Sequence, residues 1–484
     1  MVRRSGEHMR SIITILSSIG FIAAAPAPVQ GWSSQHWLED LAQAQQAFKT
    51  KYANIDWLEK DREVPLDSLF RRASNRLGSA RSDEDARAVF DRLVRRVGDG
   101  HVSIGWRQGP APRSSTVSAP PHSNDVCHDL GFDEGRSAAG TAASLPNYRP
   151  VGATGPFPAG IVQIGARKVG VIRIAGFEPQ GAPQICRAAL QALHVSASKS
   201  CDDKCQDAIL TWSYAKLTTD LEGQVRLLQA SGATVLLVDI TNNGGGTEWA
   251  EAAARILSPK ALTSERRGFV RGQHWSEQWE GLAAQLRQAA ASADTLDRAR
   301  LQSWLAEAEQ ARRDADQTCI EAKRCALVAR AGYATGLVGA AQAGAFAGKP
   351  WADLVFNIAQ FPYHDSVWSG PLAVLVDDET WSAAEEFAAV LQDNRAAVIV
   401  GNRTGGAGCG HTNGGTPTTL KNSGAILELP DCVRFRADGS NEVAGVIPDI
   451  LTGMKASDGR TFKAKLIAAR LPDVINLAVE RQQR

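Results

Sequence analysis

Apolar residues recur at helical spacing near the start of the chain, between residues 33 and 97. Leu69, Phe70 and Leu77 are among the positions that follow this period. Apolar positions three and four residues apart are typical of amphipathic helices, so we predict a helical region here. The pattern ends at a turn containing Gly and Asp within residues 98–104, which leads into a short strand.

Short continuous apolar runs replace the helical period farther along the chain. The runs at residues 169–174, 235–240 and 372–376 are bounded by turn residues, which is typical of buried strands. Helical patterns lie among them at residues 209–230 and 248–257. Strands that alternate with helices predict an α/β core.

Three segments differ in composition from this core. Residues 107–166 are rich in Pro, Ser, Gly and Ala and show little periodicity, so we predict a long linker or loop. Residues 278–345 are rich in Ala, Gln, Arg and Glu and predict a helical insertion. We interpret the insertion as a solvated extra layer in preference to a lid or an oligomer contact. An amphipathic helix is expected within the C-terminal residues 453–484.

The N-terminus has the pattern of a secretory signal peptide. Arg3, Arg4 and Arg10 precede an apolar run over residues 12–25, and small residues follow. The run is short for a membrane span. We therefore expect residues 1–31 to be a signal peptide, in preference to a disordered or anchored N-terminus, and a periplasmic or secreted mature protein.

Length and charge bound the remaining possibilities. A chain of 484 residues is too long for one simple core, and its net charge of +1 provides no electrostatic basis for nucleic-acid binding. Beyond the N-terminus, no stretch is apolar enough to span a membrane. The predicted organisation is a signal peptide (1–31), an N-terminal helical domain ending in a short strand (32–106), a linker or loop (107–166), an α/β core (167–452) with a helical insertion (about 278–345), and a C-terminal helix (453–484).

Eight cysteines agree with export, because an even number in an oxidising compartment favours disulfides. Their pairing is left open by the sequence. The plausible short loops are Cys201/Cys205, Cys319/Cys325 and Cys409/Cys432. A zinc site is disfavoured because the chain has no Cys-x-x-Cys pair and no adjacent pair of histidines.

Ser382 lies where a predicted strand ends and a predicted helix begins. The free N–H groups and the positive dipole end of a helix favour negative charge, which suits a nucleophile whose reaction creates an oxyanion. Ser382 and Glu385 also have the spacing of a capping box. Taken alone, this segment therefore favours helix capping over catalysis.

Three other positions are candidates for chemistry. The Asn/Gly turn that ends residues 239–246 can present backbone N–H groups to an anion, although it is equally typical of a tight strand-to-helix turn. His101 has the side chain that most often serves a serine nucleophile as a base, with His411 in reserve. Glu442 offers a carboxylate that could orient a neighbouring group. Taken alone, His101, His411 and Glu442 are each more often structural.

Four segments, in order, resemble the carboxyl-terminal processing (tail-specific) serine proteases. They are Asp-Ile-Thr-Asn-Asn-Gly-Gly-Gly at 239–246, the strand and Ser-Ala-x-Glu at 371–385, Val-Gly-x-x-Thr-x-Gly at 400–406, and Glu-x-x-Gly-Val-x-Pro-Asp-Ile at 442–450. The chain is most similar to the branch that contains the tricorn protease core and the interphotoreceptor retinoid-binding repeats. His101 stands where that branch has its histidine.

Two departures from the family pattern shape the prediction. The processing proteases use a Ser-Lys dyad, but the lysine position is Ala407 here, and no lysine lies between Ser382 and Lys421. The resemblance therefore implies His101 as the base. Residues 107–166 also lack the strand pattern of the PDZ module that many members carry, so capture of substrate C-termini is not expected.

The resemblance implies a crotonase/ClpP-like α/β core and an exported serine peptidase that cleaves proteins or oligopeptides. Ser382 would form an acyl-enzyme, His101 would take its proton, and Glu442 would be the acidic residue of the site. The oxyanion would be stabilised by the N–H groups of Gly245 or Gly246 and of Ala383. No metal or organic cofactor is implied, and an oligomer is compatible with the sequence.

Two alternatives remain at the level of sequence. The first is an inactive family member that binds a peptide or an apolar ligand, which the presence of Ser382, His101 and Glu442 together argues against. The second is an acyl-CoA enzyme of the crotonase type, which fits poorly with a signal peptide and has no use for Ser382.

Overall fold

The structure is a computed structural model that describes residues 32–106, 125–132, 140–152, 155–197, 201–317 and 326–483. The predicted signal peptide (1–31) and the pair Cys319/Cys325 lie outside these ranges. Among the helices formed within them, none combines the length and hydropathy that a membrane crossing requires.

A seven-stranded sheet forms the centre of the molecule, with the order β13-β9-β8-β5-β4-β3-β2. Its strands are β2 (Arg149–Val151), β3 (Ala159–Ile164), β4 (Arg167–Arg173), β5 (Val235–Asp239), β8 (Leu372–Val376), β9 (Val398–Gly401) and β13 (Ile450–Leu451). Strands β4, β5, β8, β9 and β13 run parallel, whereas β2, β3 and β4 pair antiparallel. The α/β fold class predicted from the sequence is confirmed.

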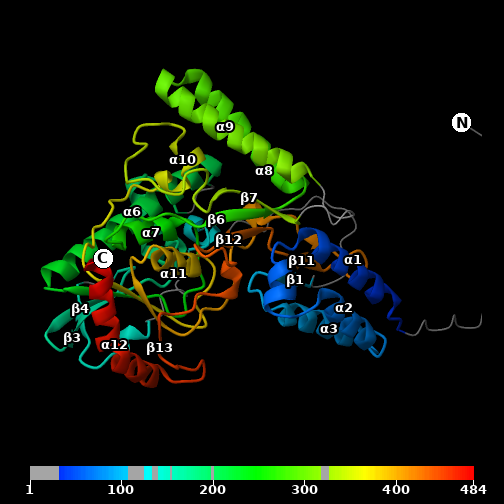
Figure 1. Cartoon of the computed structure of the whole chain (residues 1–484), viewed down its shortest axis with the longest axis horizontal. Helices are drawn as coiled ribbons and strands as arrows, with labels where there is room; N and C mark the ends of the chain where they lie inside the picture. The colour runs from blue at the N-terminus through cyan, green and yellow to red at the C-terminus, as the bar shows by residue number, and fades with distance from the viewer. Residues whose placement is uncertain are drawn as a thin grey trace, which may run out of the picture.

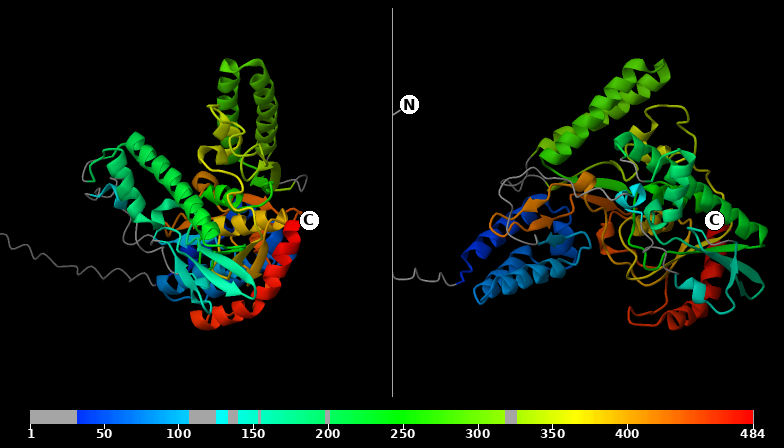
Figure 2. Two further views of the ribbon diagram at one scale, coloured as in Figure 1. Left: turned by 90° about the vertical axis from the view of Figure 1, so that its left-hand side faces the viewer. Right: turned by 180° about the vertical axis from the view of Figure 1, so that it is seen from behind.

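Helices cover both faces of this sheet. The covering helices are α6 (Asp203–Ala230), α7 (Trp249–Leu257), α11 (Ala383–Asp393) and α12 (Arg460–Gln483), and α5 (Pro183–Ala192) packs against α6. Side chains alternate along a strand, so Leu236 and Val238 of β5 face α6, α7 and α11, while Leu237 faces α12. Figure 2 shows α12, in red, across the sheet from α6. Full burial on both sides explains the continuous apolar runs.

An N-terminal helical unit packs beside the sheet. It consists of α1 (Gln35–Lys51), α2 (Leu66–Leu77) and α3 (Asp83–Val97). Helix α3 begins at Ser82, which accepts a hydrogen bond from the Asp85 N–H, and ends at Gly98 in the left-handed conformation. The following strand β1 (Ser103–Gly105) pairs with β11 (Ile426–Glu428), and β11 pairs with β10 (Thr418–Thr419). The unit therefore shares a small sheet with the C-terminal third of the chain.

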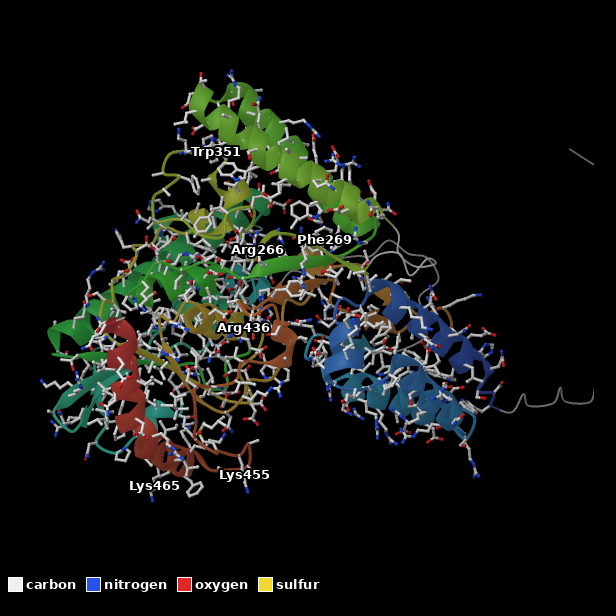
Figure 3. All side chains as sticks on the ribbon, viewed as in Figure 1. Arg266, Phe269, Trp351, Arg436, Lys455 and Lys465 are labelled. Atoms are coloured by element: carbon white, nitrogen blue, oxygen red, sulfur yellow. A yellow bond between two sulfur atoms is a disulfide. The ribbon has the colours of Figure 1, made fainter. Side chains whose placement is uncertain are left out.

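A helical hairpin projects from the molecule (Figure 1). Helices α8 (Gln273–Ser292) and α9 (Thr295–Asp316) follow β6 (Arg266–Val270), whose sheet partners are β7 (Val328–Tyr333) and β12 (Cys432–Phe435). Trp275 and Trp279 of α8 pack against Phe269 near one end of the hairpin, and Trp304 of α9 contacts Trp351 farther out (Figure 3). The hairpin is thus anchored along the face it turns to the core.

The remaining helical segments are short. They are α4 (Val126–Asp129), α10 (Ala352–Val355), a π-helical turn (Trp57–Asp61) and 3-10 turns at Ala142–Ser144, Pro179–Gly181, Asn357–Gln360, Thr412–Gly414 and Glu442–Ala444. A disulfide between Cys127 and Cys186 ties α4 to α5. The expected pairs Cys201–Cys205 and Cys409–Cys432 are confirmed.

Two boundaries predicted from the sequence need correction. Residues 149–164, expected within the linker or loop, contain β2 and β3 of the central sheet. These strands escape pattern analysis because β2 has only three residues and Pro and Gly surround both. Gly160 is required where it stands, since a Cβ there would lie 2.4 Å from the Tyr148 ring. Likewise, residues 328–333 of the expected helical insertion form the edge strand β7.

Candidate active site

Ser382 lies in the turn between β8 and α11, with φ 56° and ψ −120°. Positive φ is uncommon for a residue with a side chain and costs on the order of 1–3 kcal/mol. The turn is held by the Glu385 carboxylate, whose Oε2 accepts the Ser382 N–H at 3.0 Å. This is the carboxylate half of the capping box expected from the sequence. Ser382 is half-buried at the start of α11.

Glu385 also holds a second loop against the serine. Its Oε1 accepts hydrogen bonds from the Thr404 hydroxyl at 2.5 Å and from the Gly406 N–H at 2.8 Å, and its Oε2 accepts the Ala407 N–H at 2.8 Å. Burial raises the pKa of Glu385. One buried carboxylate therefore fixes the position of loop 404–407 relative to Ser382.

The Asn/Gly turn after β5 packs directly under the serine. The backbone carbonyl of Asn243 accepts the Trp381 N–H at 2.9 Å, and the side-chain oxygen of Asn243 accepts the Gly245 N–H at 2.8 Å. Gly245 has φ 103°, and a Cβ there would lie 2.9 Å from Ser382 Cβ and 3.0 Å from the Ala383 nitrogen. Glycine is required here both by conformation and by this close approach.

The two glycines proposed for the oxyanion site differ in their hydrogen bonds. Gly245 already donates to Asn243. Gly246 lies beside Phe177, which bonds to the residues on either side of Gly246. In the part of the chain that the structure describes, no backbone hydrogen bond uses the N–H of Gly246 or of Ala383. These two N–H groups are therefore the better candidates to receive an anion.

His101 follows α3 and is held through both its backbone and its ring. The His101 N–H donates to Asp99 Oδ1 at 3.0 Å, and ring Nδ1 lies 2.7 Å from the Ala407 carbonyl oxygen. A carbonyl only accepts, so Nδ1 carries the proton and Nε2 carries the lone pair. A Cβ at Gly410 would lie 3.0 Å from Cε1 of the ring. Burial lowers the pKa of His101, which favours the neutral base.

Trp381 joins the histidine turn to the serine turn. Its ring lies between two glycines, and a Cβ at Gly100 or at Gly405 would fall 2.4 or 2.5 Å from ring atoms. The Gly100 N–H also donates to the Gly406 carbonyl at 3.2 Å. The structure thus brings the turns of His101 and Ser382 together, although they are far apart in the sequence.

Asp99, which is not among the predicted site residues, supports the histidine turn. Its Oδ2 accepts hydrogen bonds from the Tyr52 hydroxyl at 3.0 Å and from Asn54 Nδ2 at 2.8 Å. Burial raises the pKa of Asp99 to about 6. Asn54 Oδ1 in turn accepts from Asn441 Nδ2 at 2.8 Å. The sequence feature that could have identified Asp99 is the Asp-Gly-His turn, because a short acidic side chain often hydrogen-bonds the backbone of its own turn.

Glu442 is buried and pairs with Arg434. Its Oε1 accepts from Arg434 Nη2 at 2.9 Å, and its Oε2 contacts Arg434 Nε. Arg434 Nη2 also donates to the Ser382 carbonyl at 3.2 Å. The hydrogen bonds of the described residues include none between Glu442 and His101, so Glu442 reaches the site through Arg434. The sequence feature that could have identified Arg434 is its position between two apolar residues of a strand.

Two further features of the site concern histidine and metals. The His411 ring lies 6.0 Å from the His101 ring, centre to centre, so the reserve candidate stands beside the proposed base. Among the described residues, no cluster of three or more His, Cys, Asp or Glu side chains could hold a metal ion.

Comparison with known proteins places the chain in a family. The model of peptidase family S41 matches residues 168–452. Mature CPAF is similar in structure, with TM-score 0.57, 17% sequence identity, and coverage of 92% of this chain and 98% of that one. Mature CPAF complexed with lactacystin gives TM-score 0.58, 16% identity, and coverage of 92% and 99%.

The photosystem II D1 C-terminal processing protease is a more distant neighbour, with TM-score 0.32, 14% identity, and coverage of 86% and 93%. No curated protein matches the chain in sequence. The family match spans more than half of the 484 residues and confirms the resemblance to the carboxyl-terminal processing proteases. The chain belongs to peptidase family S41 and is a serine-type peptidase.

Proposed function

We propose that the protein is an exported serine peptidase in which Ser382 is the nucleophile and His101 is the general base. The observation that carries the proposal is the hydrogen bond from His101 Nδ1 to the Ala407 carbonyl, because it leaves Nε2 as the proton acceptor. The strained conformation of Ser382 and the packing of Trp381 between Gly100 and Gly405 support it. Nucleophiles are commonly presented on such strained turns.

In the proposed reaction, His101 Nε2 takes the Ser382 hydroxyl proton as Oγ attacks the peptide carbonyl. The N–H groups of Ala383 and Gly246 stabilise the tetrahedral oxyanion, and one such donor is worth roughly 3 kcal/mol. His101 then gives the proton to the leaving amine. Water hydrolyses the acyl-enzyme by the same steps in reverse order. Gly245 contributes by letting its turn approach Ser382 closely.

Export is part of the proposal. The disulfides Cys127–Cys186, Cys201–Cys205 and Cys409–Cys432 support an oxidising compartment, where such bonds persist. Residues 1–31 would be removed as a signal peptide, leaving a periplasmic or secreted enzyme. The N-terminal residue of the protein purified from that compartment, read by mass spectrometry, tests this directly. A full-length N-terminus recovered from the cytoplasm contradicts export.

The catalytic test is cleavage of an unstructured protein and a mixed peptide pool, read by mass spectrometry. Ser382→Ala and His101→Gln should each lower cleavage by at least about 10³-fold with the fold intact. The matched controls are His128→Gln on the exposed part of α4 and His411→Gln beside the base, and both should keep cleavage near the wild-type level.

The outcomes separate the alternatives. Cleavage that survives Ser382→Ala refutes the mechanism. Loss in His411→Gln with full activity in His101→Gln reassigns the base. Wild-type protein that binds an apolar ligand tightly and cleaves nothing supports the inactive binding protein instead.

A further inference from the structure

One buried guanidinium lies between the two loops of the site. Arg434 stands on β12 with its side chain buried, pointing away from its apolar neighbours Val433 and Phe435. Its Nη2 donates to the Ser382 carbonyl at 3.2 Å and to the Gly408 carbonyl at 3.0 Å. The same nitrogen therefore contacts both the nucleophile turn and the loop that orients the base.

The contact with Ser382 has a consequence for the oxyanion site. The Ser382 carbonyl and the Ala383 N–H belong to one peptide group, which is planar and trans. Any donor that fixes the direction of the carbonyl also fixes the opposite direction of that N–H. Besides Arg434, the carbonyl accepts from the Glu385 N–H at 2.9 Å and the Glu386 N–H at 3.1 Å. Arg434 is the side-chain donor of this set.

The contact with Gly408 acts on the base. Gly408 follows Ala407, whose carbonyl accepts the His101 Nδ1 proton. A shift of Gly408 would move that carbonyl and change the tilt of the imidazole ring. Gly408 has φ 59°, one of several conformations open to glycine, so contacts such as those with Val443 and Arg434 select it.

Carboxylates in turn hold the guanidinium. Glu442 accepts from Nη2 at 2.9 Å, Glu386 lies 3.2 Å from Nη1, and Glu265 lies 3.6 Å from Nε. A planar guanidinium with fixed N–H directions, paired on several sides, keeps one orientation. Lysine offers a point charge with no such fork.

We infer that Arg434 is a positioning residue of the peptidase: it aims the Ala383 N–H at the oxyanion and keeps the base-orienting loop in register with the nucleophile. The inference rests on the proposed function. It also assigns Glu442 the task of orienting Arg434. The competing explanation is an ion pair that only attaches β12 to α11.

The test is the split between kcat and KM in Arg434→Lys and Arg434→Met, measured on a peptide that the wild type cleaves. Misaiming one oxyanion donor lowers kcat by roughly 100-fold while KM changes less than about threefold. A peptide aldehyde, which mimics the tetrahedral state, should bind weaker by a similar factor, whereas a product peptide binds as before. Circular dichroism and Tm report the fold.

Arg436→Lys is the matched control. Arg436 lies two residues farther along (Figure 3) and pairs with Asp393 at 2.7 Å. Within the described part of the chain, Arg436 forms no hydrogen bond or ion pair with Ser382 or Gly408. Its kcat and aldehyde affinity should stay within about threefold of the wild type. The inference is overturned if Arg434→Lys and Arg436→Lys lose kcat equally, or if Arg434→Lys keeps the wild-type kcat.

If both Arg434 variants unfold, Glu442→Gln replaces them, because it removes the pairing charge at nearly constant size. The same kcat and aldehyde losses are expected, and an unchanged kcat refutes the inference. Failure of the proposed function remains distinguishable, since it shows as wild-type cleavage that persists in Ser382→Ala. Failure of the inference shows as Ser382-dependent cleavage that Arg434 variants retain.

Discussion

Ser382 keeps an unfavourable backbone conformation because several neighbours hold it there. Glu385 accepts its N–H, Arg434 donates to its carbonyl, and Asn243 accepts the N–H of the preceding Trp381. Each hydrogen bond contributes on the order of 1 kcal/mol, enough together to offset the cost of the positive φ. Strain maintained in this way is typical of a site that must present a reactive side chain.

Gly245→Ala should inactivate the enzyme without unfolding it. The new methyl group would lie 2.9 Å from Ser382 Cβ and from the Trp381 carbonyl, at a φ of 103°. We expect kcat/KM to fall by at least about 100-fold, because the serine turn and its N–H groups must move. Gly281→Ala in α8, where a Cβ meets nothing within 4 Å, is the control and should leave activity unchanged. A fully active Gly245→Ala enzyme contradicts the close approach.

The pH dependence of kcat/KM should identify His101 as the base. A protonated imidazole cannot accept the serine proton, so activity is lost as pH falls through the pKa of His101. Burial lowers this pKa below its ordinary 6.5, so the half-maximal point lies below pH 6.5. Asp99, with a pKa raised to about 6, titrates nearby. The Asp99→Asn enzyme should therefore still lose activity as pH falls. If this loss disappears in Asp99→Asn, the titrating group is Asp99 and not His101.

At the scale of elements, the glycine-rich loop after β9 is the part that connects the proposed nucleophile and the proposed base. Glu385 binds it at Gly406 and Ala407, and Arg434 binds it at Gly408. A disulfide from Cys409 to Cys432 fastens its far end to β12. A loop rich in glycine has high conformational entropy, so these anchors determine its working conformation.

Removing the Cys409–Cys432 disulfide by a double serine substitution should lower both stability and activity. The bond closes a span of 23 residues, and its loss costs roughly 3 kcal/mol. Activity should fall because Gly410, which packs on the His101 ring, lies next to Cys409. The control is the Cys201/Cys205 double serine variant, whose span of 4 residues costs about 2 kcal/mol and lies away from the site. Urea unfolding and kcat measure the two effects, and equal activity losses in the two variants would argue against a local role.

At the scale of the whole molecule, the site depends on how the N-terminal helical unit attaches to the sheet. His101 comes from that unit and Ser382 from the core. The two parts share the β1–β11 pairing and the hydrogen bond between Asn54 and Asn441 at 2.8 Å. Because Asn54 also binds Asp99, this bond links the histidine turn to the segment that carries Glu442.

A double-mutant cycle of Asn54→Ala and Asn441→Ala tests this attachment. Asn54 is buried, Asn441 is half-buried, and the two share one hydrogen bond, so we expect a coupling free energy of about 1 kcal/mol in urea unfolding. Each single variant should also lower kcat more than it raises KM. Strictly additive effects on both readouts would mean that the two parts are positioned by other contacts.

Local patterns were sufficient for much of the fold. The apolar runs of β5 and β8 marked buried strands, and the helical period marked α6 and α11. Strands β2 and β7 were missed because they lie at sheet edges, where partner strands supply the stabilisation, and β3 was missed because Pro and Gly surround it. Among the site residues, Ser382 and the Gly245 turn had local signals, whereas Arg434 and Asp99 did not stand out.

The sequence by itself determined the elements and the residue types at their ends: a strand leading to a serine, a glycine turn, and an Asp-Gly-His turn after a helix. Backbone propensity and hydrophobic periodicity act over a few residues, so they can be recognised in the sequence alone. Only the tertiary structure decided that His101 hydrogen-bonds Ala407, and that Arg434 joins Ser382 to Glu442. Such contacts form between distant segments when the core packs, and their geometry depends on the whole fold.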